Sequence, residues 1–221
     1  MKKATLYFND IRLSPSQIHK FRGYVGNVFV EHDLIHNHDK ATGRHIYRYP
    51  LIQFKIIDKV PCIIALTDKA VQVFTEIFMR LDEIDIEGDT IPVNEKDFKI
   101  ETVDFGFSEE TYMYDFLSPW MALNQKNYST FIKLNTFEEK KALLKRILTG
   151  NILSMAKYLG CHLEPDQRIQ SDLNFRQLRT TLKGKSMLGF EGAFKTNFHL
   201  PNYSALGKSV SRGYGCIKKC I

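Results

Sequence analysis

Histidine is concentrated in one short stretch of the chain, residues 32–49, which we call the histidine loop. Four of the seven histidines lie there, interleaved with lysine, arginine and tyrosine. An imidazole takes and gives protons near neutral pH, because its unperturbed pKa is about 6.5. His36 and His38 stand one residue apart beside fixed cations. The stretch therefore predicts a base and an acid that act in the same reaction.

Two other interpretations of the histidine loop stay open. Asn37, Asp39 and Gly43 break any helical or strand period, so a loop is expected, and such a loop can be only solvated surface. A zinc site is the second interpretation, because His32 and His36 would lie one turn apart if a helix extends that far. Zinc sites usually add cysteine or carboxylate ligands in a recognisable pattern, and none is evident nearby.

The composition indicates a folded protein. The chain of 221 residues is long enough for one large domain or for two of about a hundred residues each. Its hydrophobic content of 43% supports a packed core, and no apolar run approaches the length of a membrane span. The N-terminus has too few apolar residues for a signal peptide. The cysteines form no Cys-x-x-Cys pair and are sparse for a disulfide framework, so a cytoplasmic protein is expected; they are Cys62, Cys161, Cys216 and Cys220.

Charge is distributed unevenly along the chain. Residues 1–100 carry fourteen Lys and Arg against fourteen Asp and Glu, whereas residues 140–221 carry fifteen against four, a net charge of +11. A basic half joined to a neutral half predicts a surface that binds a polyanion. Scattered Lys and Arg that only keep the protein in solution are the alternative, but the size of the asymmetry favours the polyanion.

The first half of the chain has the apolar periods of two helices set among strands. Ser14 and Pro15 are typical of an N-cap and a first helical position, and Thr67 is expected to cap a second helix. The expected order β-α-β-β-α-β is that of a ferredoxin-like fold. The expected elements are a strand over 4–8, a helix with Ile18, Phe21, Val25, Val28 and Phe29 on one face, strands over 46–57 and 61–66, a helix with its apolar face from Ala70 to Leu81, and strand-like segments over 84–86 and 97–107.

The second half predicts another unit rich in β-α-β elements. A helix is expected over 137–159, with Gly150 in a position to divide it in two. A turn at residues 183–185 joins two strands that are surrounded by basic residues. The expected strands cover 112–117, 175–182 and 186–200, and a last strand lies near residue 217.

The segment from Leu206 to Ile217, which we call the glycine-rich segment, suits contact with phosphate. Glycines let the backbone approach a ligand closely and turn N–H groups toward phosphate oxygens. Lys208 and Arg212 add charge, and Ser209 adds a neutral donor. A nucleotide-binding P-loop is excluded, because it needs a glycine where Asn202 stands. The alternative is a glycine-rich turn before an edge strand.

The glycine-rich segment resembles the corresponding loop of the repeat-associated mysterious proteins of CRISPR systems. More narrowly, and over essentially its whole length, the chain resembles the endoribonucleases that cut CRISPR precursor RNA into guide RNAs. The glycine-rich segment is the most specific part of the resemblance, since catalytic residues vary widely in the family. The other matching parts are Phe21-Arg-Gly23, the histidine loop with Arg44-His-Ile-Tyr-Arg-Tyr49, and Phe116-Leu-Ser-Pro-Trp-Met-Ala-Leu-Asn124.

The resemblance implies an α+β protein of two tandem ferredoxin-like domains, which we place at residues 1–100 and 101–221. It implies a metal-independent nuclease without a cofactor, whose partner is CRISPR repeat RNA lying across the face between the domains. Other CRISPR effector subunits and a second copy of the chain are further partners that the resemblance allows. No membrane is expected.

The resemblance also implies a reaction. RNA supplies its own nucleophile, the 2′-hydroxyl beside the scissile phosphate, so a base, an acid and a cation are enough to give a 2′,3′-cyclic phosphate and a 5′-hydroxyl. We predict that His36 and His38 share the roles of base and acid, in either order. Tyr47 is expected to orient the 2′-hydroxyl or the phosphate, and Arg44 or Lys40 to offset the developing charge.

The residues expected to touch RNA are basic side chains and members of the glycine-rich segment. Two other classes of function stay open: an RNA-holding subunit of a CRISPR complex without catalysis, and a metal-dependent hydrolase that a chelator would inactivate. His19, His162 and His199 are expected to be structural. The expected RNA-binding residues are Lys40, Arg48, Lys183, Lys185, Gly207, Lys208, Ser209, Arg212, Gly213 and Gly215.

Overall fold

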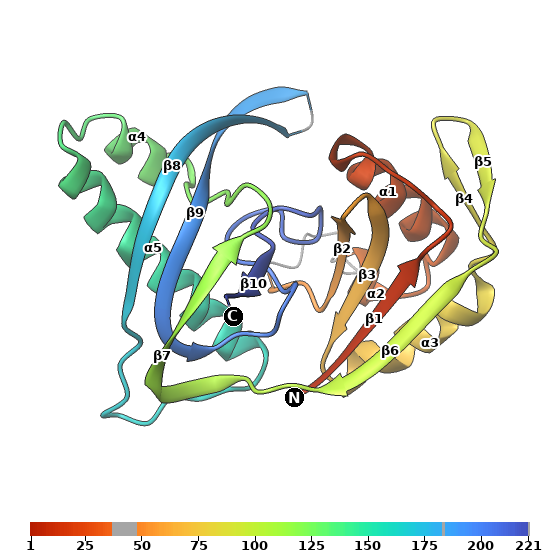
Figure 1. The fold of residues 1–221 in the computed structure, drawn as a ribbon, viewed down its shortest axis with the longest axis horizontal. Helices are drawn as coiled ribbons and strands as arrows, with labels where there is room; N and C mark the ends of the chain where they lie inside the picture. Colours follow the sequence, from red (N-terminus) through yellow and green to blue (C-terminus); the bar gives the residue numbers. More distant parts are fainter. Residues whose placement is uncertain (37–47, 183, 221) are drawn as a thin grey trace. The chain divides into compact units, whose positions relative to one another are not determined.

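The computed structural model describes residues 1–36, 48–182 and 184–220. The chain divides into two units: Met1–Val103 with Ser211–Gly213, and Asp104–Val210 with Tyr214–Ile221. Figure 1 colours the chain in sequence order, so the first unit runs from red to yellow-green. The placement of independently folding domains at residues 1–100 and 101–221 stays a prediction.

The first unit is built on a four-stranded antiparallel sheet of order β2-β3-β1-β6. Two longer helices connect its strands and pack against it, a short helix follows the first of them, and a small hairpin precedes the last strand. The order confirms the predicted ferredoxin-like fold. The strands are β1 (Lys2–Phe8), β2 (Ile52–Ile57), β3 (Val60–Leu66) and β6 (Lys96–Thr102), the helices are α1 (Ile18–Val28), the short α2 (Asp33–His36) and α3 (Asp68–Arg80), and the hairpin is β4 (Glu83–Ile86) with β5 (Asp89–Pro92).

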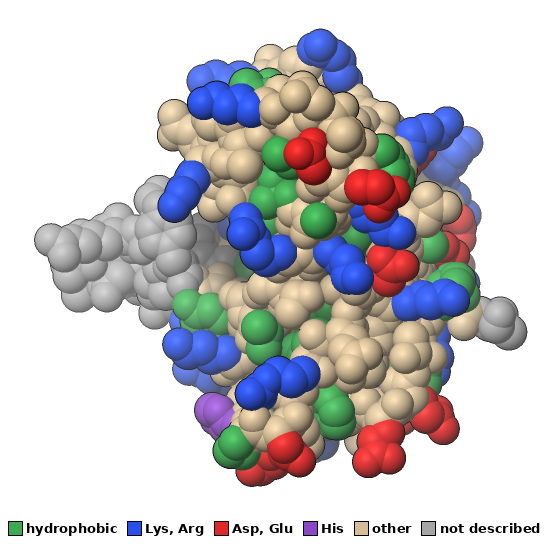
Figure 2. All heavy atoms as spheres, turned by 90° about the vertical axis from the view of Figure 1, so that its left-hand side faces the viewer, with side chains coloured by type: hydrophobic (Ala, Val, Ile, Leu, Met, Phe, Trp, Pro, Cys, Tyr) green, Lys and Arg blue, Asp and Glu red, His purple; other side chains and the backbone are tan. Residues whose placement is uncertain are grey.

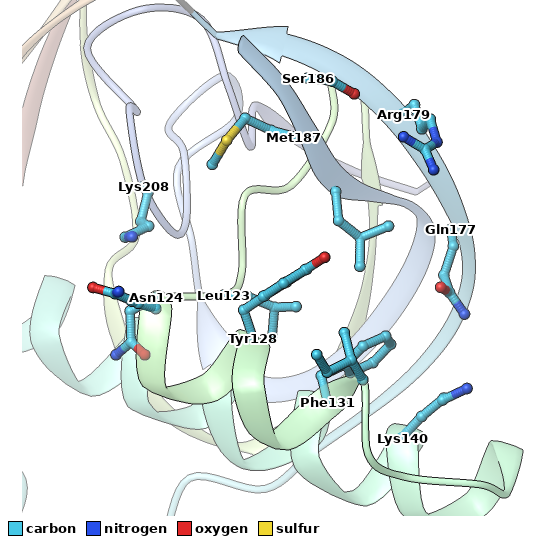
Figure 3. Close-up of a pocket in the computed structure, with 13 residues that line it drawn as sticks. Leu123, Asn124, Tyr128, Phe131, Lys140, Gln177, Arg179, Ser186, Met187 and Lys208 are labelled. Carbon is cyan, nitrogen blue, oxygen red and sulfur yellow. The ribbon is translucent and has the colours of Figure 1, made fainter.

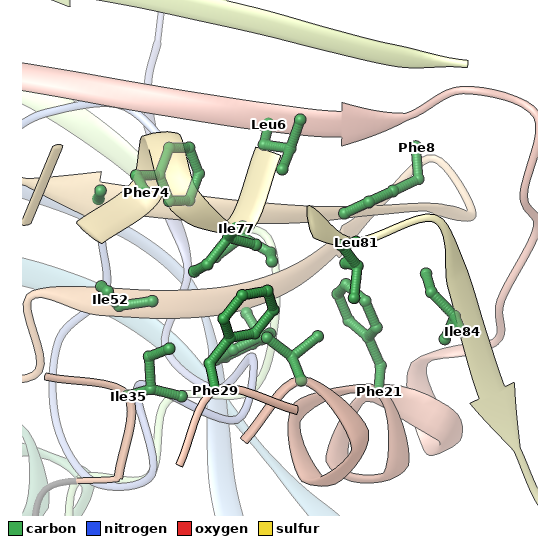
Figure 4. Packing of buried hydrophobic residues seen from close by; sticks show 14 of the residues in the cluster. Leu6, Phe8, Phe21, Phe29, Ile35, Ile52, Phe74, Ile77, Leu81 and Ile84 are labelled. Carbon is green, nitrogen blue, oxygen red and sulfur yellow. The ribbon is translucent and has the colours of Figure 1, made fainter. Parts of the chain in front are cut away.

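The start of α1 follows from its sequence. The Ser14 backbone N–H donates to the side-chain oxygen of Gln17 at 2.8 Å, and a 3₁₀ turn over Pro15–Gln17 leads into the helix. Beyond it the predicted apolar face is buried at Ile18, Phe21, Val25 and Phe29 and partly buried at Val28. Phe21 makes edge-to-face contacts with Phe8 and Phe54, each at 5.5 Å between ring centres. Figure 4 shows Phe21 within this cluster of buried side chains.

Two details of the first unit differ from the prediction. The strand expected from residue 46 begins only at Ile52 in the described part of the chain, because Pro50 has no N–H to donate to a ladder. Thr67 does precede α3, but its hydroxyl makes no capping hydrogen bond and is buried without a partner among the described atoms. The expected hairpin turn is confirmed, since Asp58 and Lys59 have φ of 50° and 67°, as a type I′ turn requires.

The second unit repeats the same strand order with one change. Its sheet is ordered β10-β7-β9-β8, so the two tandem ferredoxin-like domains are confirmed. In the first unit α3 follows the third strand, but in the second unit no helix is described between β9 and β10, and the glycine-rich segment lies there instead. The elements are β7 (Gly106–Phe116), α4 (Gln125–Phe131), α5 (Phe137–Tyr158), β8 (Ser171–Leu182), β9 (Lys185–His199) and β10 (Ile217–Lys219).

The long helix α5 is continuous, and the predicted division at Gly150 is wrong. Glu139 and Thr136 form a capping box at its start. Leu148 and Ile152, on either side of Gly150, are both fully buried, so packing outweighs the weak helix propensity of glycine. Within the described ranges, no helix combines the length and the apolar character that a membrane crossing needs.

Candidate active site

The histidine loop starts from the short helix α2, and His36 is the last residue of that helix. The side chain of His36 and the residues His38, Lys40, Arg44 and Tyr47 lie outside the described part of the structure. The roles of these five residues therefore stay predictions. The described residues do show how the start of the loop is held.

Helix α2 is fixed on both sides. Leu34 and Ile35 are buried. Just before the helix, the His32 Nε2 atom lies 2.9 Å from a carboxylate oxygen of Glu76 in α3. At its end, the Arg22 guanidinium of α1 donates to the carbonyl oxygen of Ile35 at 3.2 Å. The backbone that leads into His36 is thus tied to α1 and α3, and such fixation is what a positioned acid or base requires.

His32 takes part in an ionic cluster rather than in a described metal site. Arg80 donates to the Glu31 carboxylate at 2.6 Å and lies 5.1 Å from the centre of the Phe29 ring. Backbone and Arg80 hydrogen bonds lower the pKa of Glu31. Among the described residues, no group of three or more His, Cys, Asp or Glu is arranged to hold a metal ion. The described contacts give His32 a structural role.

Arg22 has surroundings that no pattern in the sequence predicts. It lies in the Phe21-Arg-Gly23 motif, but its position in the sequence does not predict a role. Its Nε atom is buried without a hydrogen-bond partner among the described atoms. Burial, and next the charge of Arg212, lower the pKa of Arg22. Two guanidinium groups in mutual repulsion, with one N–H unsatisfied, are an environment that an anion would stabilise.

Arg212 reaches Arg22 because the middle of the glycine-rich segment belongs to the first unit. The Phe54 backbone N–H of β2 donates to the Ser211 carbonyl at 3.4 Å, and Arg212 forms a bridge with Phe54. Gly213 has a φ of +86°, and a Cβ atom there would lie 3.2 Å from the Ile18 side chain. The charge of Arg212 is therefore placed beside α1 by backbone contacts.

The rest of the glycine-rich segment packs against the second matching motif, residues 116–124. A Cβ atom on Gly207 would lie 2.8 Å from the Trp120 ring, and one on Gly215 would overlap the Leu206 carbonyl. The Lys208 N–H donates to the Met121 carbonyl at 3.0 Å. Trp120 is fully buried. Two stretches that lie far apart in the sequence thus form one packed structure.

This packing changes the explanation of the glycines. We expected them to let the backbone approach a ligand, but at Gly207 and Gly215 the close approach is to the protein itself. Contact of these residues with RNA stays a prediction. Lys185 and Lys208 are exposed, Arg48 and Ser209 are partly buried, and Lys183 lies outside the described residues.

The basic character of the second unit is visible at its surface. Figure 2 shows many Lys and Arg side chains spread over one face, with hydrophobic side chains between them and Asp and Glu side chains mainly on its right-hand side and lower edge. Some of this charge is neutralised, since Lys141 lies 3.3 Å from Asp172 and the Arg176 Nε donates to Glu191 at 2.6 Å. The second unit (residues 104–210 and 214–221) carries sixteen Lys and Arg against ten Asp and Glu, so a net charge of +6 and a positive potential remain.

Both halves of the chain match protein-family models. Residues 1–104 match the Cas6b N-terminal domain and residues 106–220 the Cas6b C-terminal domain. An uncharacterized protein of Methanocaldococcus jannaschii is 38% identical over 143 residues, which cover 64% of this chain and 95% of that protein.

Solved structures agree with the family models. A crystal structure of Cas6b matches with a TM-score of 0.92 and 33% identity over 99% of each chain. A crystal structure of the CRISPR RNA processing endoribonuclease Cas6b matches with a TM-score of 0.80 and 30% identity over the full length of both chains. These matches extend through both units and are not confined to one ferredoxin-like domain.

Proposed function

Because this chain belongs to the Cas6b family, we propose that it is an endoribonuclease that processes CRISPR RNA and cuts repeat RNA without a metal ion. Enzymatic activity is supported by the family models and by the match to a solved CRISPR RNA processing endoribonuclease over the full length of both chains. The basic surface of the second unit suits RNA as the substrate.

The proposed reaction is an internal transesterification. A base removes the proton of the 2′-hydroxyl, the 2′-oxygen forms a bond to the adjacent phosphorus, and the bond from phosphorus to the 5′-oxygen breaks. An acid protonates the leaving 5′-oxygen, so the products are a 2′,3′-cyclic phosphate and a 5′-hydroxyl. We assign base and acid to His36 and His38 and orientation to Tyr47, with Arg44 or Lys40 offsetting the charge.

The observation that supports this assignment best is the placement of cationic groups beside the end of α2. Arg22 holds the carbonyl of Ile35, the residue before His36, and Arg212 acts electrostatically on Arg22. A phosphate bound by these guanidinium groups would lie next to the residue that we assign as base or acid. The strongest stabilisation of a phosphorane comes from cations fixed in advance of the reaction.

The test is incubation of a cognate repeat RNA with the protein in EDTA. The expected products are fragments that end in a 2′,3′-cyclic phosphate and begin with a 5′-hydroxyl, and no cut when a 2′-deoxynucleotide precedes the scissile phosphate. Loss of cleavage in EDTA would assign the protein to the metal-dependent hydrolases. Tight binding without cleavage on several repeats would make it an RNA-holding subunit.

A further inference from the structure

The second unit contains a pocket that the proposed chemistry does not use. It has a volume of about 670 Å³ and opens between α4 and the strands β8 and β9 (Figure 3). Small-molecule sites in proteins have volumes of about 300–1,000 Å³, so one nucleotide fits. All of its lining residues belong to the second unit.

The wall formed by α4 is apolar and partly uncovered. Phe131 is buried, but Tyr128 and Ile132 of the same helix are 46% and 58% exposed. Met187 and Leu188 of β9 contribute further apolar surface. In Figure 3 the Tyr128 ring points into the space between α4 and the strands. An exposed tyrosine at the mouth of an apolar pocket offers a flat face on which a planar ring can stack.

The charged groups around the pocket are all positive. Lys140, Arg179 and Lys208 line it, and none of the lining residues that the structure describes is Asp or Glu. In Figure 3, Lys208 lies across the pocket from Arg179, with Tyr128 between them. Gln125 and Gln177 add amide groups to the lining. Such a lining is complementary to a ligand with an apolar planar part, polar edges and negative charge.

One of these cations is fixed by its backbone. The Lys208 N–H donates to the Met121 carbonyl, and Gly207 before it packs directly on Trp120. The lysine is therefore presented by a rigid part of the glycine-rich segment. A cation whose backbone is fixed loses less entropy when it binds a phosphate.

We propose that this pocket binds one unpaired nucleotide of RNA, with its base stacked on Tyr128 and its phosphates beside Lys208 and Arg179. The inference rests on the proposed function, because it takes RNA as the substrate, and it adds a second contact for a single-stranded part of that RNA. Stacking tolerates any base, so the pocket would hold an unpaired nucleotide with little dependence on sequence.

The test uses the full chain and a pentamer of uridine that contains one 4-thiouridine. The expected result is a photo-cross-link to the peptides that contain residues 123–132 or 186–188. Tyr128→Ala should lower the affinity for the pentamer by about five- to a hundredfold, the usual effect of removing one stacking partner. Tyr128→Phe should retain the affinity, because the ring remains.

Tyr158→Ala is the matched control. This tyrosine of α5 is 45% exposed and does not line the pocket, so its loss should leave the affinity unchanged. Cross-links only outside the two named stretches, or an unchanged affinity in Tyr128→Ala, would overturn the inference. So would a dimer in solution that Tyr128→Ala dissociates while the pentamer fails to bind, since a second copy would then cover α4.

The two proposals fail separately. If the protein cuts repeat RNA but the pentamer does not cross-link in the pocket, this inference is wrong and the proposed function stands. If the pentamer cross-links there and repeat RNA stays intact, the pocket is confirmed and the proposed chemistry is wrong. The mapped cross-link in the wild-type protein decides the matter even if Tyr128→Ala does not fold.

Discussion

The two units have the same strand order but fill one position of the fold in different ways. In the first unit, α3 follows the third strand and buries Ala70, Phe74 and Ile77. In the second unit, residues 200–216 contain no described helix or strand, yet several of their apolar side chains are buried. They include Leu200, Ala205, Leu206, Val210 and Cys216.

Helix α3 and the irregular segment over residues 200–216 are stabilised in different ways. A helix satisfies its own backbone hydrogen bonds and needs only a periodic apolar face. An irregular segment must satisfy its backbone through particular turns, and here Gly207, Ser209, Gly213 and Gly215 all have positive φ. We therefore expect the first unit to tolerate exchange of surface residues in α3, and the second to depend on the fit of single backbone positions. We also assign the chemistry to the first unit and much of the RNA attraction to the second.

The largest expected effect tests that division of roles. His36→Ala and His38→Ala should each slow cleavage of repeat RNA by about two to four orders of magnitude, the usual contribution of a positioned acid or base. RNA affinity should change little, because phosphate attraction to Lys and Arg dominates binding. Single-turnover cleavage in EDTA and a binding titration measure the two quantities.

His162→Ala is the control for the histidine variants. His162 is exposed and follows α5 in the second unit, so its loss should leave the cleavage rate unchanged. Wild-type rates in both His36→Ala and His38→Ala would remove the proposed pair, even if the protein still cuts RNA.

The next effect compares two glycines with the same backbone angle. Gly88 in the first unit and Gly207 in the second both have a φ of +92°, but a Cβ atom meets nothing within 4 Å at Gly88 and lies 2.8 Å from Trp120 at Gly207. Gly88→Ala should cost about 1–2 kcal/mol through backbone strain alone. Gly207→Ala should cost roughly 3–5 kcal/mol, since overlap with a buried ring is added.

Urea unfolding of the two glycine variants measures this difference. The slope of the unfolding free energy against urea should stay the same, so that the midpoints report stability. Equal losses in the two variants would show that the glycine-rich segment moves away from Trp120 at little cost. The contrast between the helix and the irregular segment would then be lost.

A smaller effect concerns RNA attraction. Lys208→Ala and Arg212→Ala should each reduce the slope of log K against log salt by about 0.7, the value for one phosphate contact on a single strand. Lys69→Ala is the control, because Lys69 is an exposed residue of α3 in the first unit. A slope that stays unchanged in both variants would mean that the glycine-rich segment does not touch the RNA backbone.

Much of the fold could be predicted because its signals are local. The spacing of Ile18, Phe21 and Val25 gives a helix face, and the same holds for α5. The start of β2 was predicted too early, because Pro50 has no N–H for strand pairing. The continuity of α5 was not predicted, because packing on both sides of Gly150 outweighs the weak helix propensity of glycine. The glycine-rich segment occupies the position of a helix in the second unit, and no hydrophobic periodicity in the sequence indicates this.

The candidate site was less predictable for a different reason. Lys208 and Arg212 stood out because they are charges among glycines. Arg22 did not, because its role depends on a hydrogen bond to the Ile35 carbonyl and on the nearby charge of Arg212. Neither residue is close to Arg22 in the sequence. Tyr128 was missed as well, since an exposed tyrosine on a short helix becomes informative only with cations around it.

The smallest expected effect concerns an ion pair of the first unit. The Lys3 ammonium is 3% exposed and donates to the Glu101 carboxylate at 2.7 Å, across the β1–β6 pair. Hydrogen bonds from Lys3 and Lys99 lower the pKa of Glu101 in the folded state below its ordinary value of 4.5. A lowered pKa contributes stability above the unfolded value, and this contribution is lost as the pH falls through the folded value.

The stability of the protein should therefore decrease between neutral pH and acid pH below 4.5, in part through Glu101. Glu101→Gln should remove that part of the pH dependence. Because Glu101 is 29% exposed and water screens the pair, its contribution is about 1 kcal/mol or less.

Asp172 of the second unit is the comparison, since its partner Lys141 lies 3.3 Å away and Asp172 is 55% exposed. At high salt, Asp172→Asn should reduce the pH dependence of the unfolding free energy less than Glu101→Gln does. The reason is that salt screens an exposed ion pair more strongly than a partly buried one. Urea unfolding at pH 3.5 and pH 7 in 0.1 M and about 1 M salt measures both, and equal salt dependence of the two variants would show that burial of Lys3 does not protect its pair.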